Sequence, residues 1–226
     1  MKNTIIILGL LGLTIFGGIY IKLKFYDPKR RLDHEKIEVK QLADNDEIKN
    51  GDLIFHTSRS YQSKAIQLAT KSKYSHCGIV YKEGSSFFVF EAVQPVKLTP
   101  LNEWIARGQE GHYVIKRLKN ADQVLTQVTL KKMKEIGNEF KGKNYDTTFE
   151  WSDEKIYCSE LIWKVYQRGA GIEIGNLQKL SSFDLTSEIV KKKMRDRYGS
   201  KIPLNETVIS PAAVFESNLL VTVQSN

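Results

Sequence analysis

Short blocks of hydrophobic and polar residues alternate along most of the chain, and their spacing predicts both helices and strands. A short apolar run after Gly51 is typical of a strand. Residues 60–71 carry apolar positions at helical spacing. Residues 74–82 and 87–93 are rich in aromatic and β-branched side chains and flank the sequence Glu-Gly-Ser-Ser, which predicts a β-hairpin.

The second half of the chain continues this mixture. A strand is expected at residues 113–117 and a long helix at 121–140, where apolar positions recur at helical spacing. A further helix carries Cys158, with Ser152 and Asp153 as its candidate N-cap. Less regular elements are expected at 101–107 (helix), 181–193 (helix) and 208–223 (strand). Together these elements indicate an α+β domain.

The N-terminal segment differs from the rest of the chain, because residues 5–21 are apolar and carry no charge. A helix of this length spans roughly 26 Å at about 1.5 Å per residue, just under the thickness of a bilayer core. We therefore expect a membrane anchor or signal segment at 1–23, and the missing cleavage site favours an uncleaved transmembrane helix. A polar linker at 24–45 and a catalytic domain at 46–226 complete the expected organisation.

The charge and cysteine content narrow the possible functions. The net charge of +8 comes partly from basic clusters after the apolar segment and near residues 191–197, which suit solvated faces or an anionic membrane or cell-wall polymer. No nucleic-acid recognition motif accompanies this charge, so we expect no nucleic-acid partner. Two cysteines do not form a disulfide framework, and no zinc spacing, phosphate loop or dinucleotide fingerprint is present. We expect no metal and no cofactor.

Cys158 is the strongest candidate for chemistry. It lies at the predicted start of a helix, where the positive end of the helix dipole favours the nucleophilic thiolate. His76 and Glu91 lie on the two arms of the predicted hairpin. A carboxylate beside an imidazole orients the ring and stabilises its protonated form, so Glu91 suits an orienting role, His76 a base and Cys158 a nucleophile. Taken alone, a histidine in a strand is more often a structural residue than a catalytic base. A cysteine next to Tyr157, taken alone, could be a core residue.

The register of the hairpin decides whether His76 and Glu91 meet. If Lys82 pairs with Ser85 across the turn, the two side chains lie directly opposite each other, and if Lys82 pairs with Phe87 they are diagonal neighbours. Both registers place them on one face. A three-residue loop without a bulge would place them on opposite faces.

Two further residues are weaker candidates for the site, and one neighbour is interpreted as structural. His56 ends the first strand and could line a cleft. Tyr157, next to the candidate nucleophile, is a candidate for the cleft or for stabilising an oxyanion. Cys77 alternates away from His76, so we interpret it as a small buried hydrophobic residue.

Several sequence blocks then resemble a known family. In order along the chain they are GDLIF, YSHCGIV, FEAVQPVKLTPLNEWI and YCSELIWKVY, spanning about residues 46–171. This order resembles the circularly permuted branch of the NlpC/P60 cysteine peptidases, the YiiX/YebB-like amidases, in which the base precedes the nucleophile. The resemblance implies a permuted papain-like fold with a small antiparallel sheet packed against helices. It also implies that Cys158, His76 and Glu91 are catalytic.

The implied activity is cysteine-dependent amide hydrolysis through a thioester acyl-enzyme, and family analogy favours cell-wall peptides, including peptidoglycan fragments, as substrates. A lipid-directed acyl hydrolase or acyltransferase, with acylated amino compounds as possible substrates, is an alternative, and a non-catalytic binding module is another. The resemblance favours an extracytoplasmic domain held at the membrane by the N-terminal helix. The basic residues that follow this helix favour the cytoplasmic side instead.

Overall fold

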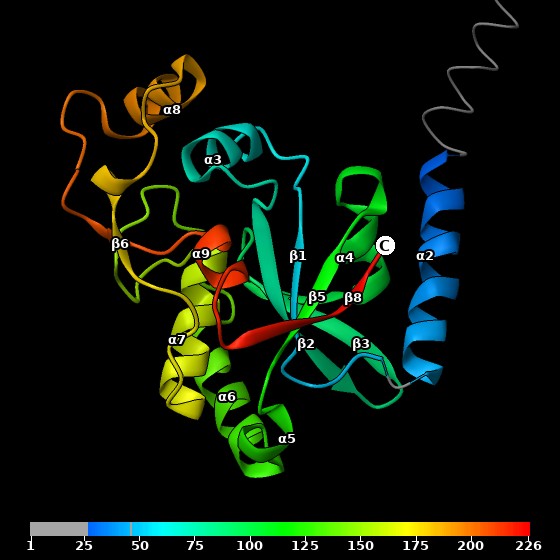
Figure 1. Cartoon of the computed structure of the whole chain (residues 1–226). Helices are drawn as coiled ribbons and strands as arrows, with labels where there is room; N and C mark the ends of the chain where they lie inside the picture. Colours follow the sequence, from blue (N-terminus) through cyan, green and yellow to red (C-terminus); the bar gives the residue numbers. More distant parts are fainter. Residues whose placement is uncertain (1–26, 46) are drawn as a thin grey trace, which may run out of the picture.

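A six-stranded antiparallel sheet, with strand order β4-β3-β2-β1-β5-β8, forms the centre of the protein (Figure 1). The computed structural model describes residues 27–45 and 47–226. The strands are β1 (Leu53–His56), β2 (His76–Glu83), β3 (Ser86–Glu91), β4 (Lys97–Pro100), β5 (Val114–Leu118) and β8 (Leu220–Ser225). This arrangement confirms the predicted α+β class with a small antiparallel sheet.

The central strands β1 and β2 are buried on both faces because their side chains alternate between two hydrophobic clusters. Leu53 and Phe55 of β1 join Cys77 and other residues on one side of the sheet. Ile54 and Val80 join the cluster on the other side. These continuous apolar runs explain why both strands lie in the middle of the sheet.

Helices cover both faces of the sheet (Figure 1). One layer contains α6 (Gln127–Phe140) and α7 (Cys158–Ala170), which pack along each other, and α7 also packs on β2. The opposite layer contains α2 (Asp27–Asp44) and α4 (Leu101–Ala106), which pack together. The chain also forms the short helices η2 (Gln109–Gly111) and α5 (Ala121–Val124), which precede β5 and α6 respectively.

The C-terminal region builds a separate wall beside the α7 N-terminus. A small cluster joins Ala65 of α3 (Ser63–Thr70) to Val190 and Met194 of α8 (Glu188–Tyr198). The remaining elements of this region are β6 (Gln178–Lys179), η3 (Leu180–Ser182), β7 (Thr207–Val208) and α9 (Pro211–Phe215).

Two helix predictions were wrong in their boundaries. The helix expected at 121–140 is divided into α5 and α6, because Thr126 accepts a hydrogen bond from the Thr129 backbone and starts a new helix. The helix that carries Cys158 begins at Cys158 itself, and Tyr157 is its N-cap. The expected cap residue Asp153 instead pairs with Lys164 and Arg168 of α7.

Three segments also differ from their expected structure. The helix expected at 181–193 lies further along the chain, as α8. The strand expected at 208–223 is interrupted, because Ser210 caps α9 and Pro211 occupies its first turn. The expected linker at 24–45 contains α2, whose Leu42 is buried in the sheet–helix core.

The predicted membrane segment at 1–23 lies outside the described residues. Within residues 27–45 and 47–226, no helix is both long enough and apolar enough to span a bilayer.

The close approach of α6 and α7 depends on Gly169. A Cβ atom at Gly169 would lie 2.8 Å from the Cα of Met133, so Gly169→Ala forces the helices apart. We expect a loss of about 1–3 kcal/mol in the free energy of unfolding, measured by urea denaturation, despite the better helix propensity of alanine. The matched control is Gly137→Ala, whose Cβ would meet only the Phe90 ring, at 3.1 Å. A Gly169 variant no less stable than this control would contradict the packing argument.

Candidate active site

His76 and Glu91 meet on the α4 side of the sheet. The hairpin pairs Lys82 with Phe87, so the second of the two predicted registers is present, and its loop consists of Gly84 and Ser85. His76 and Glu91 are therefore diagonal neighbours. Their side chains lie 2.6 Å apart, from His76 Nε2 to Glu91 Oε2, and this contact is buried.

Glu91 is a fully buried carboxylate that receives hydrogen bonds from four side chains. Besides His76, Thr99 donates to Oε1 at 2.6 Å and Trp104 Nε1 donates to Oε2 at 3.0 Å. The Arg107 guanidinium also binds Oε1. Burial alone would raise the pKa of Glu91, but the bonds and charges of His76, Arg107 and Thr99 lower it to about 2. Glu91 is therefore a stable anion.

Cys158 occupies the first position of α7, where unpaired backbone N–H groups gather. Its side chain forms hydrogen bonds with Cys77 and with His76. The Cys77 hydrogen bond, together with the bond and charge of His76, lowers the pKa of Cys158 well below its ordinary value although burial opposes this. The structure thus favours a thiolate at the predicted nucleophile.

The same contacts act on His76 in the opposite direction. Burial lowers the pKa of His76, but the hydrogen bonds and negative charges of Cys158 and Glu91 outweigh it and raise the pKa to about 9. Because Nε2 contacts Glu91, Nδ1 is the ring nitrogen left for Cys158. The three predicted residues thus form one array of thiolate, imidazolium and carboxylate.

Cys77 differs from its interpretation as a simple hydrophobic residue. It is fully buried, and it alternates away from His76 as expected. This alternation places the Cys77 side chain on the α7 side of the sheet, where its thiol forms a hydrogen bond with Cys158. Cys77 is therefore a polar neighbour of the nucleophile. The pKa of its own thiol is raised well above the ordinary value, by burial and by the negative charge of Cys158.

The two weaker candidates occupy different places. His56 is buried beside the array. Its ring stacks on Trp104 with the ring centroids 3.9 Å apart, and it is tilted relative to the His76 ring, whose centroid lies 5.4 Å away. The Tyr157 hydroxyl accepts a hydrogen bond from the Ile209 backbone at 3.0 Å, which ties the α7 N-terminus to the C-terminal region. Tyr157 thus has a bonding partner away from the array, and any role of either residue in chemistry stays a prediction.

Tyr145 was not predicted from the sequence, where it was only part of a loop. It lines the same pocket as Cys158, and burial together with the negative charge of Cys158 raises the pKa of Tyr145 well above its ordinary value. Its hydroxyl oxygen accepts a hydrogen bond from Gln62 Nε2 at 3.0 Å, and Arg197 in turn donates to Gln62 Oε1 at 2.6 Å. Since the oxygen is the acceptor in the Gln62 bond, its own proton is available to the space beside Cys158.

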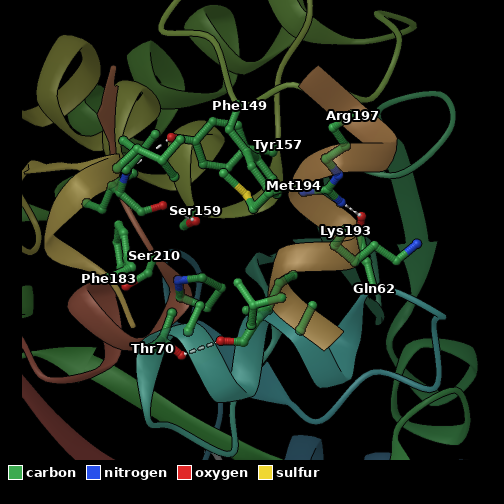
Figure 2. Close-up of a pocket in the computed structure, with 18 of the residues that line it drawn as sticks. Gln62, Thr70, Phe149, Tyr157, Ser159, Phe183, Lys193, Met194, Arg197 and Ser210 are labelled. Atoms are coloured by element: carbon green, nitrogen blue, oxygen red, sulfur yellow. Dashed lines mark hydrogen bonds between the residues drawn. The ribbon is translucent and has the colours of Figure 1, made fainter. Parts of the chain in front are cut away.

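An apolar pocket opens beside Cys158 on the side of α3 and α8 (Figure 2). In Figure 2, Phe149, Met194 and Phe183 surround this space, and Arg197 lies beside Gln62 at one end. The apolar lining includes Ala65, Ile66, Ala69, Leu180, Leu185, Val190 and Val208.

A second cleft lies next to His76. It is lined by His56, His76, Arg59, Arg107 and Tyr145, together with serine, threonine, glutamine and small apolar side chains. The two spaces share Gln62 and Tyr145 in their linings, and they differ in chemistry because, among the described residues, histidine side chains line only the second one.

One group of side chains in the described part of the chain has the composition of a metal site. His34, Glu35 and Glu38 of α2 bring possible ligand atoms within 4.8 Å of one another. The Glu38 carboxylate already accepts hydrogen bonds from Tyr113 and Asn226, and His34 is exposed. The group lies in the α2 layer, across the sheet from α7 (Figure 1). It does not fit a resident catalytic metal.

The array has the composition of a papain-like site, a cysteine, a histidine and a third polar residue, and comparison with known proteins identifies the family of the chain. The solved structure described as metalloprotein YiiX from Escherichia coli O157:H7 superposes with a TM-score of 0.75 at 48% identity, covering 79% of this chain and 97% of that one. The uncharacterized protein YiiX of Escherichia coli K12 is 50% identical over 173 residues, which cover 76% of this chain and 84% of the relative.

The family itself is identified by its sequence profile. Residues 47–224 match the family described as permuted papain-like amidase enzyme, YaeF/YiiX, C92 family. The chain belongs to this family, as the resemblance of its sequence blocks indicated.

The ion pair predicts the pH dependence of thiol reactivity. The thiolate persists below the ordinary range of a cysteine because its pKa is lowered, and the imidazolium persists until the pH passes about 9. We expect iodoacetamide to alkylate Cys158 rapidly at pH 6, and His76→Ala to shift the onset of alkylation upward by at least about one pH unit. Peptide mapping of residue 158 across pH 4–10 measures this, with His112→Ala as the control. An unchanged onset in His76→Ala would contradict the pairing.

Proposed function

We propose that the protein is a cysteine-dependent amide hydrolase that forms a thioester acyl-enzyme. The observation that supports this proposal is the continuous array from Cys158 through His76 to Glu91, in which each member stabilises the charge of the next. Family membership supports amidase chemistry in general. The cysteine mechanism and the substrate are our inference.

In the first step, the Cys158 thiolate attacks the carbonyl carbon of the amide and negative charge develops on the carbonyl oxygen. The Cys158 backbone N–H, at the helix N-terminus, and the free proton of the Tyr145 hydroxyl are the available donors for this oxygen. His76 then gives its proton to the leaving nitrogen, the C–N bond breaks, and a thioester remains.

In the second step, His76 is neutral and takes a proton from water, which attacks the thioester carbonyl. The carboxylic acid leaves and the thiolate–imidazolium pair is restored. Glu91 keeps the ring oriented throughout, since its four hydrogen bonds fix the carboxylate.

The substrate proposed from family analogy is a cell-wall peptide, with the domain on the extracytoplasmic side of a membrane to which the N-terminal segment holds it. The apolar pocket favours a second candidate, a lipid-directed acyl hydrolase or acyltransferase. Its lining beside Cys158 suits a hydrocarbon better than a polar peptide. In either case the acyl part of the substrate faces the pocket and the leaving group faces His76.

Removing members of the array tests the mechanism. We expect Cys158→Ala and His76→Ala each to reduce the hydrolysis of an acyl amide by at least about a thousandfold. Glu91→Gln keeps the size of the side chain but removes its charge, so a loss of about a hundredfold in kcat is expected. The measurement is release of free amine from N-acyl amides and from muropeptides, with melting temperature as the control for folding. Full activity of Cys158→Ala would refute the proposal.

The size of the apolar pocket separates the two candidates. Ala65 lines this pocket and is buried, so Ala65→Leu narrows it. If the pocket holds an acyl chain, the ratio of kcat/KM for dodecanoyl over acetyl amides should exceed about 10 in the natural chain and fall at least about fivefold in the variant. Lys64→Leu, one position away on the same helix, is the control. A dodecanoyl-to-acetyl ratio of kcat/KM that is unchanged in Ala65→Leu would support the peptide substrate.

A further inference from the structure

The cleft beside His76 carries two arginines in its lining. Arg59 and Arg107 both line it, together with the imidazoles of His56 and His76. Among the residues that the structure describes, no aspartate or glutamate lines this cleft. An arginine guanidinium presents several donors in a planar fork that matches a carboxylate.

The charges near the cleft leave a positive excess. The Glu91 carboxylate is fully buried, and its oxygens are held by His76, Thr99, Trp104 and Arg107. Arg107 uses one nitrogen for Glu91 while its side chain remains 44% exposed, so it has further donors for a ligand. Within the described part of the chain, the exposed Arg59 guanidinium has no ion pair or hydrogen bond.

The state of His56 is consistent with a positive local field. Burial, followed by the charges of His76 and Arg107, holds the pKa of His56 well below its ordinary value. His56 therefore stays neutral where it lines the cleft, stacked on Trp104. The positive charge available to a ligand comes from the two arginines.

We propose that this cleft binds the leaving group of the substrate through a carboxylate, so that the enzyme cleaves amides whose nitrogen carries a carboxylate on the adjacent carbon. This inference rests on the proposed amide hydrolysis. The leaving nitrogen must lie beside His76, which protonates it, and Arg107 is separated from His76 by only the Glu91 carboxylate that both contact.

This short separation selects the kind of anion. In an N-acyl amino acid, one carbon separates the amide nitrogen from the carboxylate, so a nitrogen beside His76 brings the carboxylate close to the side of the array where Arg107 contacts Glu91. The reaction balances as acyl amino acid plus water giving a fatty or other carboxylic acid plus a free amino acid. The same chemistry is present at the C-terminal residue of a peptide, whereas an internal peptide bond places a neutral amide in the cleft.

Matched substrates test the carboxylate directly. The first pair is N-dodecanoylglycine and N-dodecanoylglycinamide, and the second is acetyl-Leu-Leu-Gly and its C-terminal amide. In each pair, the terminal amide has nearly the same size as the terminal carboxylate but lacks its negative charge. We expect kcat/KM to favour the carboxylate by about tenfold, mainly through KM, in the pair whose acyl part fits the apolar pocket. The pair that shows the preference identifies lipid or peptide as the source of the substrate.

The substitution Arg59→Gln provides the matched variant, since within the described residues Arg59 has no hydrogen bond or ion pair to the array. We expect it to reduce the carboxylate preference about fivefold, and Arg59→Glu to reverse it. The control is Lys132→Gln, which removes the same charge from an exposed position on α6. Equal kcat/KM values for carboxylate and amide, or a preference that Arg59→Gln leaves intact, would overturn the inference.

A second measurement tests the anion site without hydrolysis of a substrate. Iodoacetate and iodoacetamide alkylate the same thiol, but only iodoacetate carries a carboxylate. We expect the ratio of their rates at Cys158 to fall severalfold in Arg59→Gln and to stay constant in Lys132→Gln. If neither substrate pair is hydrolysed, the proposed function fails, while this ratio still tests the anion site. A ratio that Arg59 does not affect counts against the site.

Discussion

One buried negative charge, the carboxylate of Glu91, organises the site. An ionised group without access to water is costly unless it is fully hydrogen-bonded. The protein meets this requirement with donors from three elements and the loop after α4: His76 of β2, Thr99 of β4, Trp104 of α4 and Arg107. The carboxylate therefore fixes the relative positions of these elements as well as the orientation of the imidazole.

From Glu91 the charges alternate in sign toward the nucleophile. The anion stabilises the His76 imidazolium, and the imidazolium stabilises the Cys158 thiolate at the start of α7. Two thiols share this environment with different outcomes. Cys158 is favoured as the anion. Cys77, which directly follows His76 in the sequence, stays protonated and donates a hydrogen bond to Cys158. The assignment of charge thus follows from geometry rather than from residue type.

The sequence was sufficient where the relevant contact is local. His76 and Glu91 share a hairpin, so the period of two predicted that they lie on one face in two of the three registers considered, and the structure has one of these two. Cys158 was found from its position at a helix start, although the helix begins later than expected. The contacts of Tyr145 and Arg107 could not be predicted in this way, because irregular chain separates each of them from its partner and no periodicity relates them. Family resemblance supplied the link between hairpin and helix.

The order of the segments along the chain has a consequence for synthesis. Glu91, His76 and Cys158 all precede the wall of the apolar pocket, much of which is built from residues 180–211. Translation therefore produces all three members of the array before much of the pocket wall that lies beside Cys158. The pocket is completed last, when α8 has been synthesised and can pack on α3. A chain truncated before residue 180 would contain Cys158, His76 and Glu91 but would lack much of the wall of the pocket.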